Sequence, residues 1–411
     1  MLTGRAWAVI GGGILLWVAS RVVGSPDLHM IALALLLLVP LAALLVRATR
    51  HDLEALRRLS ARRVFPGGKV RVDLEVHNRG RRRTSLLLLE DQLPASLGRS
   101  ARAALVDVPP DGRRDVAYRV TAQGRGRYAI GPLSVWVGDP FDLFRHRMEF
   151  SDRHDLVVYP EVEDLGPFPV AAPAGGAGES STRQLFRSGD EFYTMRQYEM
   201  GDDLRRIHWP SVARTGELMI RQDEAVRRAQ AAVLLDTRDS ALGRDHEAFE
   251  RAVSAAASIG THHLRAGFTV RLASPDLAPR AVDREQFLEL LALVRPSRTS
   301  QITPVLQQLR RSAAPGTTVV VVTHVPTTDE LAALSRLGSG YATRLAVLIE
   351  TGGRERLPIR PRWEADRRVD RARTSLQRAG WEVLVLHPST KLGDAWRLRT
   401  KRPVRRIAAF S

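Results

Sequence analysis

Residues 231–240 have the sequence AAVLLDTRDS, in which five apolar residues lead directly to Asp236. Similar apolar runs recur downstream, and segments with helical spacing of apolar residues separate them. Buried strands that alternate with helices predict a mostly parallel sheet with helices on both faces. The predicted strands are 231–236, 269–273, 317–323, 344–350 and 381–386, and the predicted helices are 247–265, 284–293, 329–337 and 364–379. We therefore expect residues 229–411 to form a doubly wound α/β domain.

Residues 51–165 follow a different pattern, because apolar and polar residues alternate at period two in short runs such as 70–76. Gly, Pro and Asn cluster between these runs, at 66–68, 78–80 and 109–112. Short alternating strands separated by turns predict an antiparallel β-sandwich domain. The turn near residue 80 carries a run of arginines, which is typical of a solvated loop rather than a binding site. These are Arg79, Arg81, Arg82 and Arg83.

Two apolar segments open the chain, at residues 6–20 and 30–46. The second has 17 residues without a charge, near the lower end of the roughly 17–25 that cross a bilayer. A short loop, 24–27, joins the segments and favours a transmembrane hairpin in residues 1–50, and the alternative for the first segment is a signal peptide.

Arginines follow the second segment, whereas only Arg21 lies near the loop, so both ends of the hairpin should face the cytoplasm. These arginines are Arg47, Arg50, Arg57, Arg58, Arg62 and Arg63. We therefore expect a multi-pass protein of the inner (plasma) membrane with cytoplasmic soluble domains.

The composition limits the class of protein. A length of 411 residues favours two or three domains, and 44% apolar with 26% charged residues suits a folded chain. The absence of cysteine excludes disulfides, thiolate zinc sites and cysteine nucleophiles. A net charge of +17 favours anionic partners such as the membrane surface or nucleic acid. Nucleic-acid binding is the weaker choice, because acids interrupt the basic residues and no stacking aromatics recur among them.

Residues 166–228 connect the two predicted domains. Residues 171–181, AAPAGGAGESS, have the composition of a linker. Residues 188–224 interleave charges of both signs with Tyr and Trp and show no regular period, so side-chain pairing should order them. Asp202 or Asp203 is expected to cap a short helix that runs to about Trp209. We expect Arg205 and Arg206 to face carboxylates such as Glu191 or Glu224.

In this segment the sequence resembles the bacterial family called domain of unknown function 58. The matching motif consists of Arg196, Tyr198, Gly201, Asp202, Arg205, Arg206, Ile207, Trp209, Ser211 and Arg214. Residues 125–141 and 157–160 also resemble the β-rich domain of that family. The resemblance implies a membrane hairpin, a β-rich domain, the motif, and a domain similar to the von Willebrand factor A fold. It implies no particular reaction. It does imply partnership with a MoxR-type AAA+ ATPase and a transglutaminase-like membrane protein.

Two hypotheses concern the role of the motif. In the first, it is a latch that fastens the domains together, with Trp209 as a buried apolar anchor. In the second, it is a surface that binds a partner. Ion-pair networks are often purely structural, which favours the latch.

A magnesium site is the next hypothesis to weigh. The von Willebrand factor A fold holds magnesium with an Asp-x-Ser-x-Ser sequence after the first strand, and with a Thr and an Asp from later loops. Here Asp236 and Ser240 fit that pattern, but Arg238 replaces the middle serine and Thr323 is followed by His324. Thr299, Ser300 or Thr303 are candidates for the middle threonine, yet the hard oxygen ligands remain too few for the cation. We therefore expect a degenerate site without a metal. Asp236 still lies at the carboxyl end of a strand, where open α/β sheets bind ligands, and a partner carboxylate could meet Arg238 there.

The remaining candidates for chemistry are weaker. His262 and His263 lie on a predicted helix without a carboxylate at metal-ligand spacing, and no glycine-rich loop is suited to phosphate. The basic cluster at 401–406 is either a lipid-binding or a solvated tail. The sequence thus predicts a membrane-anchored, non-enzymatic interaction or assembly protein without a cofactor, bound to an AAA+ ATPase. The alternatives are a metal-dependent adhesion-type or hydrolytic domain that uses Asp236, and a nucleic-acid binder.

Overall fold

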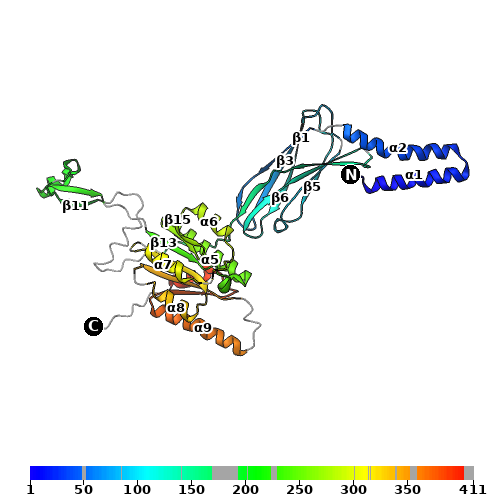
Figure 1. The fold of residues 1–411 in the computed structure, drawn as a ribbon. Helices are drawn as coiled ribbons and strands as arrows, with labels where there is room; N and C mark the ends of the chain where they lie inside the picture. The colour runs from blue at the N-terminus through cyan, green and yellow to red at the C-terminus, as the bar shows by residue number, and fades with distance from the viewer. Residues whose placement is uncertain are drawn as a thin grey trace. The chain divides into compact units, whose positions relative to one another are not determined.

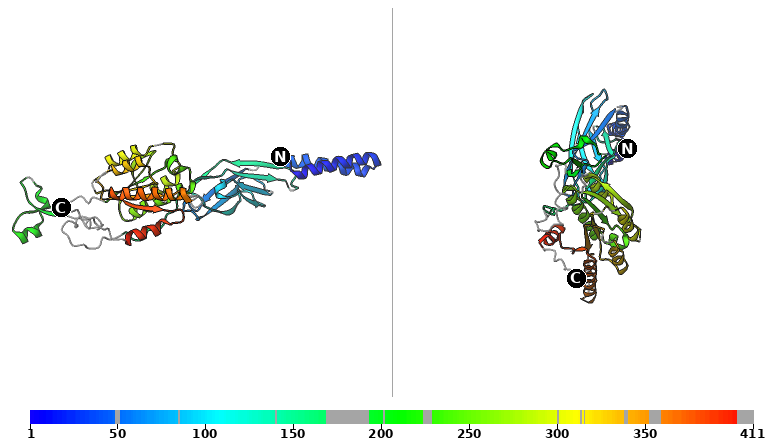
Figure 2. Two further views of the ribbon diagram at one scale, coloured as in Figure 1. Left: turned by 90° about the horizontal axis from the view of Figure 1, so that it is seen from below. Right: turned by 90° about the vertical axis from the view of Figure 1, so that its left-hand side faces the viewer.

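The structure is a computed structural model. It describes residues 1–411 except 49–51, 85, 140, 169–192, 201, 224–228, 300, 313, 315, 338–339, 352–358 and 402–411. The chain divides into two compact units, Met1–Pro160 and Glu161–Ser411 (Figure 1, Figure 2). The expected linker at 171–181 and most of the basic tail lie outside the described residues.

The first unit begins with two antiparallel helices, α1 (Gly4–Val23) and α2 (Pro26–Ala48). The Thr3 side chain accepts a hydrogen bond from the Ala6 amide and caps α1. Gly24 ends α1 in the left-handed conformation, with φ of 72°, which glycine adopts without the strain of a side chain. Both helices are long and apolar enough to cross a membrane, as the sequence predicts.

Ten strands make up the rest of the described part of this unit, and all their pairings except β2–β10 are antiparallel. They form three sheets with the orders β1-β3-β6, β2-β10-β7 and β5-β4-β8-β9. The bounds are β1 (Leu53–Leu59), β2 (Arg63–Val64), β3 (Lys69–Asn78), β4 (Leu87–Asp91), β5 (Ala101–Leu105), β6 (Arg113–Thr121), β7 (Gly126–Ile130), β8 (Leu133–Gly138), β9 (Arg145–Phe150) and β10 (His154–Val158), with a short 3₁₀ helix η1 (Ala95–Leu97) after β4.

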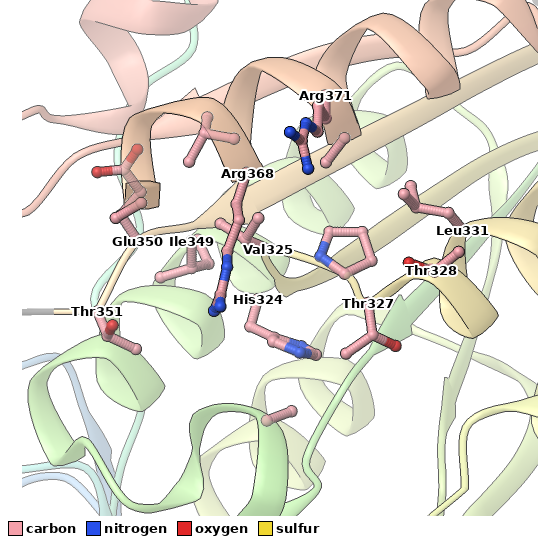
Figure 3. A pocket seen from close by; sticks show the side chains of 15 residues that line it. His324, Val325, Thr327, Thr328, Leu331, Ile349, Glu350, Thr351, Arg368 and Arg371 are labelled. Carbon is pink, nitrogen blue, oxygen red and sulfur yellow. The ribbon is translucent and has the colours of Figure 1, made fainter. Parts of the chain in front are cut away.

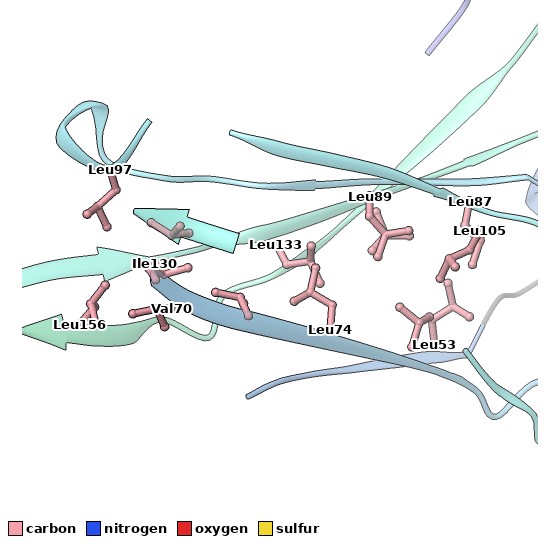
Figure 4. Packing of buried hydrophobic residues seen from close by; sticks show 14 of the residues in the cluster. Leu53, Val70, Leu74, Leu87, Leu89, Leu97, Leu105, Ile130, Leu133 and Leu156 are labelled. Atoms are coloured by element: carbon pink, nitrogen blue, oxygen red, sulfur yellow. The ribbon is translucent and has the colours of Figure 1, made fainter. Parts of the chain in front are cut away.

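One apolar core joins the three sheets (Figure 4). Strand β3 shows why the sequence alternates: Val70, Val72, Leu74 and Val76 are buried in this core, and the residues between them are more exposed. Within the same unit Arg57 forms a buried ion pair with Asp91, whose carboxylate also accepts a hydrogen bond from Tyr118 at 2.6 Å. Burial and the hydrogen bond to Asp91 raise the pKa of Tyr118 far above its ordinary value.

The second unit contains a six-stranded sheet with the order β15-β14-β13-β16-β17-β18. All neighbours are parallel except β14 and β15, which are antiparallel. The elements of this sheet and its helices are β13 (Gln230–Leu235), α5 (His246–Arg265), β14 (Thr269–Ser274), β15 (Leu277–Val282), α6 (Arg284–Leu293), α7 (Thr303–Ser312), β16 (Thr318–His324), α8 (Thr328–Ser335), β17 (Thr343–Ile349), α9 (Ile359–Arg378), β18 (Glu382–Leu386) and α10 (Leu392–Lys401). The predicted mixed α/β domain with a mostly parallel sheet is therefore confirmed, and β15, α7 and α10 are additions to it.

Helices cover both faces of this sheet. The residues 232 and 234 of β13 pack in one core with α7, α8 and α9, while α5 contacts β13, β14, β16 and β17. Gly260 lets α6 approach α5 closely, because a Cβ atom there would lie 2.1 Å from Phe287. Strand β14 lies on one side of β13 and β16 lies on the other, so the order of the strands reverses direction at β13. This reversal places the carboxyl ends of β13 and β16 next to each other, the position at which α/β sheets usually form ligand sites.

Candidate functional site

The carboxyl end of β13 carries a buried ion pair between two residues of one turn. Asp236 has no exposed surface and Arg238 is 4% exposed. The Arg238 guanidinium donates from Nε to Asp236 Oδ1 at 2.8 Å and from its terminal nitrogen to Oδ2 at 2.7 Å. Such a two-pronged contact is the strong geometry for an arginine and a carboxylate.

Strand β16 and helix α8 complete the cluster. The Thr323 hydroxyl donates to Asp236 Oδ2 at 2.6 Å, and the same Arg238 nitrogen reaches Glu330 Oε1 at 2.6 Å. His324 lies between the two acids, 3.8 Å from Asp236 Oδ2 and 3.4 Å from Glu330 Oε2. Glu330 also accepts the Thr327 amide and so caps α8. We call Asp236, Arg238, Thr323, His324 and Glu330 the edge cluster.

Charge pairing decides the protonation of this cluster. Burial would raise the pKa of Asp236, but the hydrogen bonds from Arg238 and Thr323, together with the nearby His324 ring, hold it well below its ordinary value. Burial would likewise raise the pKa of Glu330, yet the Thr327 amide, His324 and Arg238 keep it low. Both acids are therefore ionised at neutral pH, and Arg238 is the cation that compensates them.

The expected magnesium ligands do not converge. Arg238 occupies both carboxylate oxygens of Asp236, and Ser240 lies exposed in the π-helical turn η3 (Asp239–Gly243). The Thr299 hydroxyl donates to Asp276 instead, at 2.8 Å, while Ser300 lies outside the described residues. In the described part of the chain, no group of three or more His, Asp or Glu side chains is arranged to hold a metal ion. The carboxylate that meets Arg238 is the chain's own Glu330.

A cavity of about 720 Å³ opens beside the edge cluster, at the carboxyl ends of β16 and β17 (Figure 3). Its walls include Val325 and Leu331 near α8, and Arg368 and Arg371 project over it from α9. Glu350 also lines the cavity, and its Oε2 lies 2.9 Å from His387 Nδ1. Sequence reasoning missed these arginines, because α9 carries arginines along much of its length and the spacing alone does not mark the two that reach the cavity.

The motif segment forms a small module of its own. Strands β11 (Tyr193–Gln197) and β12 (Met219–Asp223) pair antiparallel, and the 3₁₀ helix η2 (Leu204–Arg206) and helix α4 (Trp209–Thr215) lie between them in sequence. The main chain ties them together, since Tyr198 donates to Leu218 and His208 donates to Met219. Ile207 bridges to Ile220, which is buried. We call residues 193–223 the motif module, and the described motif residues all fall within it.

The cap expected at Asp202 or Asp203 is found at Asp203, but the helix that it caps is shorter than predicted and ends at Arg206. Asp203 caps η2 by accepting the Arg205 amide at 3.0 Å, and Asp202 accepts the Glu199 amide at 3.0 Å. Helix α4 begins at Trp209, so the predicted end of one helix is the start of another. Gly201, Glu191 and Glu224 lie outside the described residues, so the expected pairing of Arg205 and Arg206 with those acids is not described.

The expectation that Trp209 is a buried anchor is wrong. Its side chain is 66% exposed, and Met200 and Leu204 in the same module are 99% and 60% exposed. The physical reason is that, among the side chains of the module that the structure describes, Ile220 alone is buried, so these residues offer little apolar surface against which Trp209 could pack. Ser211 makes a contact within the module, at 2.9 Å to His208 Nδ1, and Arg214 lies in the last turn of α4.

His262 and His263 are buried packing residues on α5. Their rings contact Phe168, and His263 also contacts Phe268. Burial lowers the pKa of His263 to about 4, so the ring is neutral at physiological pH.

Comparison with known proteins places the motif in a family. Residues 194–363 match the model described as "Protein of unknown function DUF58". The uncharacterized protein YeaD of Bacillus subtilis is 24% identical over 316 residues, which cover 74% of this chain and 77% of that protein.

Matches among solved structures are weak. The CARDB domain of the PF1109 protein from Pyrococcus furiosus has a TM-score of 0.21 at 15% identity, covering 26% of this chain and 93% of that one. A β-glucosidase from Listeria innocua has a TM-score of 0.16 at 15% identity, covering 25% and 16%. Scores this low support no inference about fold or function. The family match and the relative both rest on sequence, and together they show that residues 194–363 of this chain are similar to the DUF58 family of proteins of unknown function.

Proposed function

We propose that this chain is a membrane-anchored, non-enzymatic interaction protein that binds a partner protein through its motif module on the cytoplasmic side. The two apolar helices provide the anchor, and the arginines after α2 support the cytoplasmic orientation. The family resemblance suggests a MoxR-type AAA+ ATPase as the partner, with a transglutaminase-like membrane protein as the second choice.

The exposed apolar side chains of the motif module carry this proposal. Met200, Leu204, Trp209 and Leu218, which fall within 19 residues of the sequence, are 99%, 60%, 66% and 43% exposed. Clustered exposed apolar residues mark interaction sites, and tryptophan is among the residues that most often dominate binding energy at interfaces. A module held together by its own backbone bonds can present these side chains without unfolding the α/β domain.

The edge cluster argues against the enzymatic and metal-dependent alternatives. A metal or substrate that approached Asp236 would have to displace a two-pronged arginine contact and the Thr323 hydroxyl. Displacing the guanidinium would break a buried ion pair, which costs several kcal/mol, and displacing the Thr323 hydroxyl would remove a buried hydrogen bond. The cluster is better suited to holding β13, β16 and α8 together than to chemistry.

The finer fold assignments belong to the same proposal. The strand order with a single antiparallel edge strand, β15, supports a von Willebrand factor A-like fold for residues 229–411. The common core of the three antiparallel-rich sheets supports a β-sandwich within residues 51–165.

Site-specific photocrosslinking in native membranes tests the proposal. A photoreactive phenylalanine analogue at Trp209 should form a crosslink to one discrete protein, which antibodies against the MoxR-type ATPase and the transglutaminase-like protein then identify. The same analogue at Trp363, which is 57% exposed on α9, is the matched control and should form no such crosslink. If position 209 crosslinks to no protein, or only to other parts of this chain, the proposal fails.

A further inference from the structure

One end of the β-rich part of the first unit is bound directly to the start of α1 and lies close to the end of α2. The Thr3 amide donates to the Leu143 carbonyl at 3.0 Å, and the Thr3 hydroxyl donates to the Asp142 carbonyl at 2.6 Å. The Leu143 side chain packs against both helices, with Ala6 and Ala42. On the other side, the Arg79 amide donates to the carbonyl of Asp52, four residues beyond the end of α2.

A preorganised loop makes the contact to α1. The buried carboxylate of Asp139 accepts backbone amides from Phe141, Leu143 and Phe144, at 2.8, 2.8 and 2.5 Å. These bonds fix the loop while the ring of Phe141 points outward and is 56% exposed. Asp139 and Phe141 belong to the stretch that resembles the family's β-rich domain, and the proposed protein–protein interaction does not account for them.

Two more apolar side chains are exposed at the same end of the sheet. In the sheet β5-β4-β8-β9, Leu87 lies opposite Leu105 on one side and Val137 on the other. Gly138, which follows Val137, lies opposite Arg145. Leu86 and Val106, which adjoin these pairs, are 37% and 65% exposed. Figure 4 shows Leu53, Leu87 and Leu105 grouped at one end of the core, with Leu97 and Leu156 at the other.

Exposed arginines border this surface. The loop after β3 is held by Asn78, whose side-chain amide donates to the Arg82 carbonyl at 2.8 Å and to the Val108 carbonyl at 3.1 Å. Arg83 pairs with Asp107 at 2.7 Å. The side chains of Arg81 and Arg82 are exposed, and among the described residues no ion pair to either is found. We call Arg81, Arg82, Leu86, Val106 and Phe141 the helix-proximal face.

We propose that the helix-proximal face lies on the membrane surface, with Phe141 in the lipid interface and Arg81 and Arg82 bound to anionic headgroups. This inference rests on the proposed membrane anchoring. A helix of 20 residues is about 30 Å long, the thickness of the hydrocarbon core, so α1 can span only if Gly4 lies near its boundary. Leu143 and Asp142 are hydrogen-bonded to the residue before Gly4, so the adjacent Phe141 comes to headgroup depth.

The chemistry of the face fits that depth. Aromatic and aliphatic side chains are stable at the bilayer interface, and arginines near a membrane are attracted to anionic lipids. The arginine run after β3, which by sequence alone is typical of a solvated loop, is thereby assigned to the lipid surface. A surface that binds a protein partner requires neither hydrogen bonds to Thr3 nor a position beside α1 and α2. These two features therefore favour the membrane over a protein as the occupant of the helix-proximal face.

Single-cysteine spin labelling of the full chain tests this proposal, because the native sequence contains no cysteine. Labels are placed by Phe141→Cys, by Leu15→Cys in α1, and by Ser96→Cys in η1 at the other end of the core. Collision rates with oxygen and with a water-soluble nickel chelate measure lipid exposure in vesicles of phosphatidylcholine with or without phosphatidylglycerol. We expect a lipid signal at Leu15, a water signal at Ser96 and an intermediate, interfacial signal at Phe141.

The arginines are tested with a matched pair of variants. Arg81→Gln/Arg82→Gln should lower the interfacial population of the Phe141 label roughly tenfold or more in anionic vesicles. Arg99→Gln/Arg119→Gln, which removes the same charge from exposed positions elsewhere in the unit, should leave that population unchanged.

The outcomes separate the two proposals. A water signal at Phe141 together with a lipid signal at Leu15 overturns the helix-proximal face and leaves the anchor intact. A water signal at Leu15 overturns the anchor itself. If both double arginine variants change the interfacial population of the Phe141 label to the same extent, the proposed binding of Arg81 and Arg82 to anionic headgroups is overturned.

Discussion

Replacing Arg238 by alanine should destabilise the α/β domain more than any exposed arginine substitution. The Asp236 side chain is fully buried, and Arg238 supplies both of its charge-assisted hydrogen bonds, at 2.8 and 2.7 Å. After truncation, the carboxylate keeps the Thr323 hydroxyl at 2.6 Å and the amide of residue 238 at 3.3 Å, which do not neutralise it. Removing one partner of a buried ion pair costs about 3–5 kcal/mol.

The loss should depend on pH in a defined direction. In the parent, the pKa of Asp236 is held low, so its stabilising contribution is present above the unfolded pKa, about 3.9, and is lost as pH falls through the lower folded value. Without Arg238, burial dominates and raises the pKa of Asp236. The deficit of the variant should therefore shrink as pH falls from 7 to 5, because protonation removes the uncompensated charge.

Hydrogen exchange of peptides that cover β13 measures this free energy in the relevant domain. Arg244→Ala, an exposed arginine in the next turn, is the control and should stay within about 0.5 kcal/mol of the parent. The double variant Asp236→Asn/Arg238→Met should recover most of the loss, because neutral groups of similar size replace the pair. A loss below about 1 kcal/mol for Arg238→Ala, or one that grows on acidification, would refute the proposed role of the pair.

Three further results are expected. Calorimetry of the full chain with magnesium or manganese should show no binding, since Arg238 occupies Asp236, and a dissociation constant in the micromolar range that Asp236→Ala abolishes would contradict this. Because burial lowers the pKa of His263 to about 4 and an unfolded histidine titrates near 6.5, the free energy of unfolding should fall by up to roughly 3 kcal/mol as pH drops from 6.5 to 4, and His263→Gln should remove this part of the slope. A reporter fused after Ser411 should be active in the cytoplasm, and activity of a periplasm-dependent reporter there would reverse the topology.

The strongly patterned elements could be predicted from sequence. The apolar runs at β13, β16 and β17 are buried on both faces of the sheet. A continuous apolar run of this length is typical of a strand in a parallel sheet that helices cover on both faces. The alternation in β3 follows equally from one buried face. Strand β15 could not be found in this way, because it is an edge strand with three of its six residues exposed and a proline within it.

The candidate site could be predicted only in part. Arg238 stands out because it replaces a ligand, but the sequence does not show that Glu330, ninety-two positions later, would share its guanidinium. Burial of Trp209 is part of the latch hypothesis, in which the ring anchors the domains, and it agrees with the general burial of large apolar residues. The module is too small to cover the ring, and only a structure reveals that.

The affinity of the partner for Trp209→Ala tests the central claim most directly. Purified MoxR-type ATPase is titrated against the full chain in detergent or nanodiscs, with Trp363→Ala as the control and melting temperature measured on the same samples. The proposed binding surface predicts an affinity loss of about 30-fold, as for an interface hot spot of about 2 kcal/mol, with an unchanged melting temperature because the ring is 66% exposed. A lowered melting temperature with full affinity would instead show that Trp209 holds the domains together, and would contradict the proposed function.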